Sequence, residues 1–154
     1  MENDDVIITS AFRTAIGSFN GSLSSKTAPK LGSTVIKKCI ENSELEKEEV
    51  DMVYMGQVLS AGVGQNPARQ ASIYAGLPNT TTNTTINQVC GSGLASVALA
   101  YNSIRCGDGN MIIAGGQESM SNAPHYIKLR KGEKVNEDKI KDTMIIDGLW
   151  DVYN

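Results

Sequence analysis

The chain has 154 residues, a formal net charge of −3 and 40% hydrophobic residues, which fits a single globular domain. This composition excludes a disordered, collagen-like or coiled-coil protein. No apolar run approaches the roughly 20 residues needed to cross a bilayer, and the acidic balance argues against nucleic acid. We therefore expect neither a membrane nor a nucleic acid as partner.

The cysteines and the first residues indicate the compartment. Three cysteines are an odd number and show no Cys-x-x-Cys spacing, so neither a disulfide framework nor a zinc site is expected. The start, Met-Glu-Asn-Asp-Asp, is acidic and lacks the basic and apolar regions of a secretory signal. These features predict a cytoplasmic protein without a bound metal.

The first apolar patterns predict a strand, a helix and a second strand. Residues 6–9 form a β-branched run that is typical of a buried strand. A helix is predicted from Ala28, because apolar residues then recur at helical spacing and Pro29 fits a first turn. Residues 50–58 predict the second strand.

The next elements are marked by their ends. A helix is predicted between Asn66, a good N-cap with a proline after it, and Gly76, which stands where the C-terminal cap belongs. Residues 80–89, rich in Thr, Ile and Val, predict a third strand. Residues 91–106 predict a third helix, which Gly107 closes.

A fourth strand is predicted over residues 111–114. The alternation of strands and helices is typical of βαβ units, so residues 1–120 predict an α/β fold with a largely parallel sheet and flanking helices. Residues 121–154 carry scattered charges and weak periodicity. We expect them to begin a second domain whose remainder is absent.

The most informative stretch places Cys90 where a predicted strand turns into a predicted helix. Gly91 and Gly93 permit a sharp turn and a close approach of other groups. The positive end of the helix favours the thiolate, which is the reactive form. From these residues alone, a nucleophile and a small buried hydrophobic cysteine remain equal alternatives, and a nucleophile also needs a base beside it.

Other polar residues carry weaker signals. Cys39 and Cys106 lie within helical patterns, and we expect both in the core. His125, the only histidine, lies in a polar segment and is expected at the surface. Basic residues between 128 and 141 alternate with acidic ones, which predicts a solvated face. Gln57 is interpreted as an ordinary polar residue at a strand end.

Several motifs, in one order and register, resemble the N-terminal part of a thiolase of the acetyl-CoA acetyltransferase type. They occupy residues 8–21, 56–59, 64–71, 87–93, 115–121 and 147–151. The resemblance implies a thiolase-like N-terminal α/β domain over 1–120, incomplete, and the truncated start of the loop domain over 121–154. It also implies that Cys90 is the acyl-carrying nucleophile, that its backbone N–H is an oxyanion donor, and that Leu149 lines the acyl pocket.

By this resemblance, two acetyl-CoA molecules condense reversibly to acetoacetyl-CoA through an acetyl-Cys90 intermediate, with no metal or other cofactor. The family's Gly-His-Pro histidine and Cys-x-Gly cysteine lie outside these 154 residues. We therefore expect the chain alone to be inactive, and to need a C-terminal half in cis or in trans within a dimer or tetramer. Two alternatives stay open: a ketoacyl-synthase-like condensing enzyme, and a gene remnant or half that is not catalytic by itself.

Overall fold

The computed structural model describes residues 5–43, 45–132 and 134–153. Its centre is a parallel three-stranded sheet in the order β2-β1-β3. The middle strand β1 (Met52–Gly56) pairs with β2 (Thr82–Ile86) on one side and β3 (Ile112–Gly116) on the other. Three of the four predicted strands are therefore confirmed, and they run parallel as expected.

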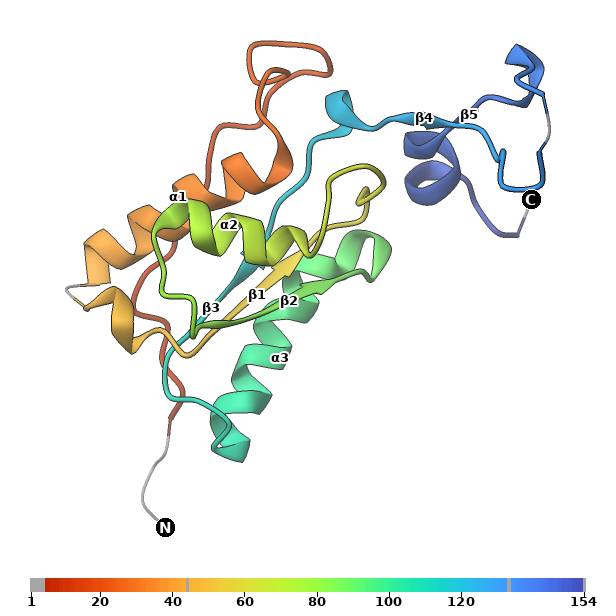
Figure 1. Ribbon diagram of the computed structural model, residues 1–154. Helices are drawn as coiled ribbons and strands as arrows, with labels where there is room; N and C mark the ends of the chain where they lie inside the picture. Colours follow the sequence, from red (N-terminus) through yellow and green to blue (C-terminus); the bar gives the residue numbers. More distant parts are fainter. Residues whose placement is uncertain (1–4, 44, 133, 154) are drawn as a thin grey trace.

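Helices cover both faces of this sheet. Figure 1 shows α1 (Ala28–Ser43) and α2 (Pro67–Ala75) on one face and α3 (Ser92–Cys106) on the other. Each strand except the last is followed by a helix that returns the chain, which is how neighbouring parallel strands are connected. The predicted α/β architecture is thus confirmed. None of the described helices is long and apolar enough to cross a membrane.

The caps of α2 explain why this helix could be predicted from the sequence with both of its ends. The Asn66 side chain accepts a hydrogen bond from the Arg69 N–H at 3.3 Å, and Pro67 occupies the first helical position. At the other end Gly76 adopts φ +89°, a left-handed conformation that glycine adopts at little cost. Gly107 ends α3 in the same way, with φ +79°.

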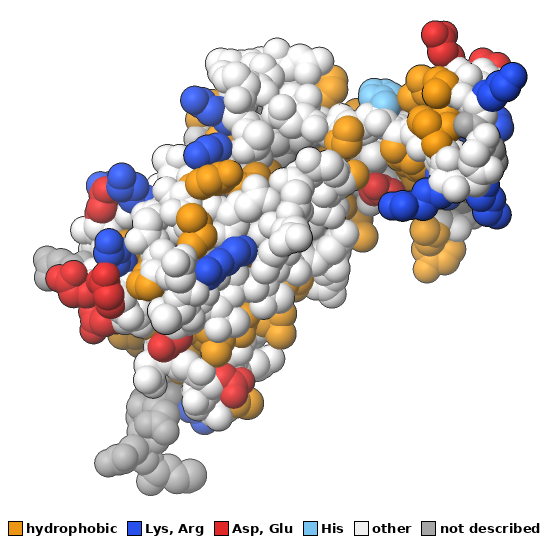
Figure 2. All heavy atoms as spheres, viewed as in Figure 1, with side chains coloured by type: hydrophobic (Ala, Val, Ile, Leu, Met, Phe, Trp, Pro, Cys, Tyr) orange, Lys and Arg blue, Asp and Glu red, His pale blue; other side chains and the backbone are white. Residues whose placement is uncertain are grey.

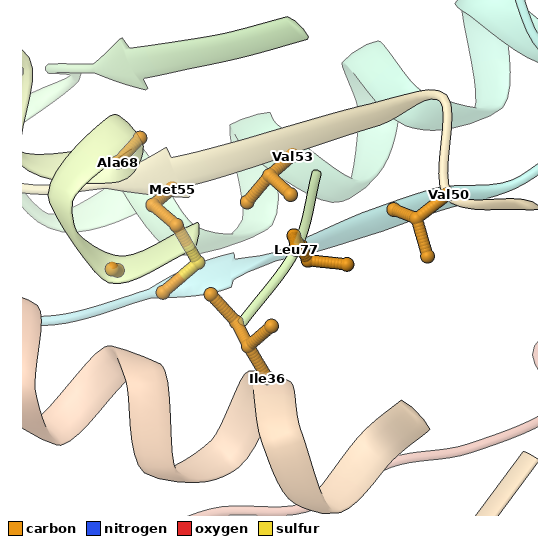
Figure 3. Close-up of a cluster of buried hydrophobic side chains, with 7 residues drawn as sticks. Ile36, Val50, Val53, Met55, Ala68 and Leu77 are labelled. Atoms are coloured by element: carbon orange, nitrogen blue, oxygen red, sulfur yellow. The ribbon is translucent and has the colours of Figure 1, made fainter. Parts of the chain in front are cut away.

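The hydrophobic core lies between β1 and the helices α1 and α2. Val53 and Met55 point from β1 toward Ile36 of α1, and Leu77 fills the space beside them (Figure 3). Ile36, Val53 and Met55 are at most 1% exposed. Burial of each such side chain stabilises the fold by about 1.5–3 kcal/mol relative to exposure.

The chain that enters β1 is fixed to the chain that enters β3 by one carboxylate. Asp51 Oδ2 accepts the N–H of Asn110 at 2.8 Å and that of Met111 at 3.1 Å. The hydrogen bond from Asn110 first, then that from Met111, lowers the pKa of Asp51 below its ordinary value. The contact fixes the register of β3 beside β1.

The predicted strand at residues 6–9 is wrong. This segment is an irregular chain, and Ile7 and Ile8 are 74% and 79% exposed. A groove of about 430 Å³ lies between the segment and β3. β-Branched residues favour an extended backbone, but a strand needs a partner about 4.8 Å away, and none lies beside this segment within the described residues.

The C-terminal tail leaves the sheet and lies at the upper right of Figure 1. It contains a short antiparallel pair, β4 (His125–Tyr126) and β5 (Lys141–Asp142), followed by the π-helical turn η5 (Met144–Leu149). The sequence did not predict these elements, because two-residue strands leave no periodic pattern. The tail returns at η5 to the carboxyl end of the sheet, next to the cavity described below.

Candidate functional site

A cavity of about 450 Å³ lies at the carboxyl ends of β1 and β3. Its walls come from four segments: the end of β1 with the loop after it, the turn before α3 with the first residues of that helix, the end of β3 with the chain as far as Met120, and the last residues of η5. This volume lies within the range of small-molecule sites, and the carboxyl edge of a parallel sheet is where such sites occur in open α/β folds. Cys90 is one of the lining residues.

Cys90 lies in a tight turn, Val89–Gly91, that leads directly into α3, and it is exposed. Val89 has φ +54°, a conformation that costs a β-branched residue about 1–3 kcal/mol. Ser92 secures the turn: its Oγ accepts the Gln88 N–H at 2.8 Å and its hydroxyl donates to the Val89 carbonyl at 2.9 Å. The turn therefore presents Cys90 outward rather than into the core.

Glycines bring this turn against the sheet. A Cβ on Gly56, the last residue of β1, would lie 2.5 Å from the Ser92 carbonyl carbon and 2.7 Å from the Gly93 nitrogen. A Cβ on Gly116, the last residue of β3, would lie 3.4 Å from Gly93 Cα. Because backbone meets backbone here, the start of α3 contacts the ends of two strands and brings Cys90 to the cavity.

The backbone N–H of Cys90, expected as an oxyanion donor, already has an acceptor. It donates to the Gln88 carbonyl at 2.8 Å, and the Gly91 N–H donates to the same oxygen at 3.2 Å. An oxyanion would therefore have to displace the Gln88 carbonyl. This hydrogen bond could not be predicted from the sequence, because it arises from the strained turn at Val89.

Leu149, expected in the acyl pocket, lines the same cavity as Cys90. It ends η5 and is 57% exposed. The preceding Gly148 touches the loop after β1, since a Cβ there would lie 3.2 Å from Leu59 Cδ2. The structure thus brings together two residues that are far apart in the sequence.

Three polar residues at this end of the sheet, Gln57, Gln117 and Glu118, were not predicted as site residues. Gln57, interpreted as ordinary, is 1% exposed and accepts the Gln117 amide at 2.9 Å. Glu118 is half-buried, and its carboxylate accepts two backbone N–H groups from the loop after β1. Burial raises the pKa of Glu118, and the two hydrogen bonds oppose this less strongly. Their position at or just beyond the ends of predicted strands was the available signal, because carboxyl ends of parallel strands meet at one edge.

Other candidates lie elsewhere. Cys39 is half-buried, but Cys106 is exposed, so its expected place in the core is wrong: it is the last residue of α3, where the buried face has ended. His125 lies on the tail, with Nε2 3.7 Å from Asp142 Oδ2 and an exposed side chain. The basic residues of 128–141 are exposed, and Figure 2 shows such side chains on the tail. Among the described residues, no three metal-ligating side chains come together.

Comparison with known proteins gives consistent matches. The family described as "Thiolase, N-terminal domain" matches residues 6–154. An acetyl-CoA acetyltransferase of Cupriavidus necator is 56% identical over 151 residues, which are 97% of this chain and 38% of that protein. One from Allochromatium vinosum is 51% identical over 99% of this chain and 39% of its own length. A probable acetyl-CoA acetyltransferase of Escherichia coli is 49% identical over 97% of this chain, which is 38% of its own length. The chain thus spans less than two fifths of these relatives.

Proposed function

The chain belongs to the thiolase family, and we propose that it is the N-terminal part of an acetyl-CoA acetyltransferase in which Cys90 carries the acetyl group. The observation that supports this most is the position of Cys90, exposed in a strained turn before α3 and lining a cavity of about 450 Å³.

In the proposed reaction, the Cys90 sulfur forms a bond to the carbonyl carbon of acetyl-CoA, and the bond from that carbon to the CoA sulfur breaks. The thiol proton passes to a base, and CoA leaves as the thiol after protonation. A second acetyl-CoA then gives an α-proton to a base, its carbon bonds to the acetyl carbon as the bond to Cys90 breaks, and the released sulfur regains a proton. The products are acetoacetyl-CoA and free Cys90, so atoms balance without a metal or redox cofactor.

The described cavity supplies the nucleophile without a histidine base. Its titratable lining residues are Cys90 and Glu118, and His125 lies on the tail, in the short β4–β5 pair. We place the base and the second acid in the part of the relatives that this chain does not span, acting in cis or as a partner chain within a dimer or tetramer. The names of the relatives favour CoA thioesters over acyl-carrier thioesters as substrates.

The acyl-transfer half-reaction tests this proposal. The chain is incubated with acetyl-CoA, and peptide mass spectrometry locates the acetyl group; a Cys90→Ser variant and a Cys106→Ser variant are the matched controls. We expect slow acetylation of Cys90 that Cys90→Ser abolishes and Cys106→Ser leaves intact, with negligible condensation by the chain alone. Equal acetylation of all three cysteines, or transfer only from an acyl-carrier thioester, would overturn the proposal.

A further inference from the structure

Glu118 joins the two strands that carry the cavity. It follows β3, and its Oε2 accepts the Val58 N–H at 2.8 Å while Oε1 accepts the Leu59 N–H at 3.1 Å. Val58 and Leu59 belong to the loop after β1, about sixty positions earlier in the chain. One carboxylate therefore holds two consecutive backbone groups of a neighbouring segment, and hydrogen bonds to a charged acceptor are the stronger kind.

Two buried amides add further hydrogen bonds to the same loop. Gln57 Nε2 donates to the Leu59 carbonyl at 2.9 Å, and Gln117 Nε2 donates to Gln57 Oε1 at 2.9 Å. Gln57 is 1% exposed and Gln117 is 7% exposed. The N–H groups of this loop are thus fixed by Glu118, which follows β3, and its Leu59 carbonyl by Gln57 of the loop itself, in surroundings where an unmade hydrogen bond is costly.

Val58 and Leu59 of the held loop line the cavity together with Gly148 and Leu149. Leu59 is 6% exposed, and a Cβ on Gly148, the residue before Leu149, would lie 3.2 Å from Leu59 Cδ2. Movement of the loop would therefore move η5 and change the space between Leu149 and Cys90. Glu118 and Cys90 are the two titratable groups among the described lining residues.

We propose that Glu118 is a positioning residue for acyl transfer at Cys90: its carboxylate fixes the backbone N–H groups of Val58 and Leu59 and, through Leu59 and Gly148, limits the cavity to short acyl groups. This inference rests on the proposed function above. Glu118→Gln keeps one acceptor oxygen but presents an NH₂ group to the second N–H, so one hydrogen bond is lost and the loop loosens. Glu118→Asp keeps both acceptor oxygens on a shorter arm.

The test compares alkylation of Cys90 by iodoacetamide and by N-hexyl iodoacetamide, in the chain as it is. Both reagents react with the same thiolate, so the ratio of the iodoacetamide rate to the N-hexyl iodoacetamide rate does not depend on the fraction of thiolate. This ratio reports the space around the sulfur. Cys106, exposed at the other end of α3, is the internal reference. Glu48→Gln, at a side chain that is 61% exposed, is the matched control variant.

We expect Glu118→Gln to lower the preference of Cys90 for the short reagent by about 3- to 10-fold, with the Cys106 ratio unchanged and partial recovery in Glu118→Asp. Burial raises the pKa of Glu118, so lowering the pH should protonate this carboxyl while the pH is still above the ordinary value of 4.5. The preference of wild-type Cys90 for the short reagent should decrease as the carboxyl is protonated, and this pH dependence should be absent in Glu118→Gln.

An unchanged Cys90 ratio in Glu118→Gln would overturn the inference, and so would a parallel change at Cys106, which would indicate general loosening of the fold. The proposed function is tested separately by acetylation from acetyl-CoA. If Glu118→Gln changes the Cys90 ratio as expected but the wild-type chain does not accept an acetyl group from acetyl-CoA, the proposed function is refuted while the contact between Glu118 and the loop stands.

Discussion

Gly56→Ala tests whether the close approach of β1 and α3 positions the nucleophile. The added Cβ would lie 2.5 Å from a backbone carbon of Ser92, and the ordinary contact range begins at 3.4 Å, so β1 and the start of α3 must separate by about 0.9 Å. Backbone cannot rotate away as a side chain can. Overpacking of this kind costs about 1–3 kcal/mol, and the lower entropy of the unfolded alanine chain offsets about 0.4–1 kcal/mol.

We therefore expect Gly56→Ala to lower the free energy of unfolding by about 1–2 kcal/mol, measured by urea unfolding with far-ultraviolet circular dichroism. Gly115→Ala is the matched control, since it lies in the neighbouring strand and its Cβ would meet only Met55 Sδ at 3.9 Å. Gly115→Ala should leave the free energy of unfolding unchanged or raise it slightly. If both variants unfold at the same urea concentration with the same slope, the close contact does not constrain the fold and the reasoning is refuted.

Three further predictions follow from the same structure. Val89→Asn should stabilise the chain by about 1 kcal/mol, because asparagine tolerates positive φ; a loss of stability in urea would contradict strain at this turn. Asp51→Asn should destabilise it by about 0.5–1 kcal/mol near pH 7. The lowered pKa means that this difference is present above the unfolded value of 3.8 and is lost as pH falls through the folded value, which urea titrations at several pH values would show. Iodoacetamide should label Cys90 roughly 3- to 30-fold faster than Cys106, because Cys90 lies just before the positive end of the α3 dipole and Cys106 at its negative end, and both are exposed. Equal labelling rates, or a rate ratio that does not change with salt, would argue against an effect of the helix dipole.

Local signals predicted the elements whose ends are set by a few neighbouring residues. The helix after Asn66 is the clearest case, because the N-cap, the proline and Gly76 act within the helix itself. Residues 6–9 failed for the opposite reason. Their composition favours an extended chain, but pairing depends on a strand distant in the sequence, which periodicity cannot reveal.

The candidate site was predicted only where a single segment carries the information. Cys90 and its glycines occupy one turn, so the local pattern identified this cysteine as a candidate, but it left an exposed nucleophile and a buried hydrophobic residue as equal alternatives. Glu118 and Gln57 could not be linked, because their contacts cross from β3 to β1 over about sixty residues. The strain at Val89 was equally hidden, since backbone conformation at one residue depends on how the whole turn packs against Gly56.

The order of the strands explains why the cavity and the stability of β3 are coupled. β1 lies in the middle, so the loop that follows it meets the end of β3 on one side and the start of α3 above it. Glu118 and Gln117, which hold that loop, belong to the chain just after β3. If β3 separates from β1, both hydrogen bonds of Glu118 break together and Leu59 loses its fixed place. Local opening of β3 would therefore release Val58 and Leu59, which line the cavity, and would also remove Ile113 from its packing against the core that contains Ile36 and Val53.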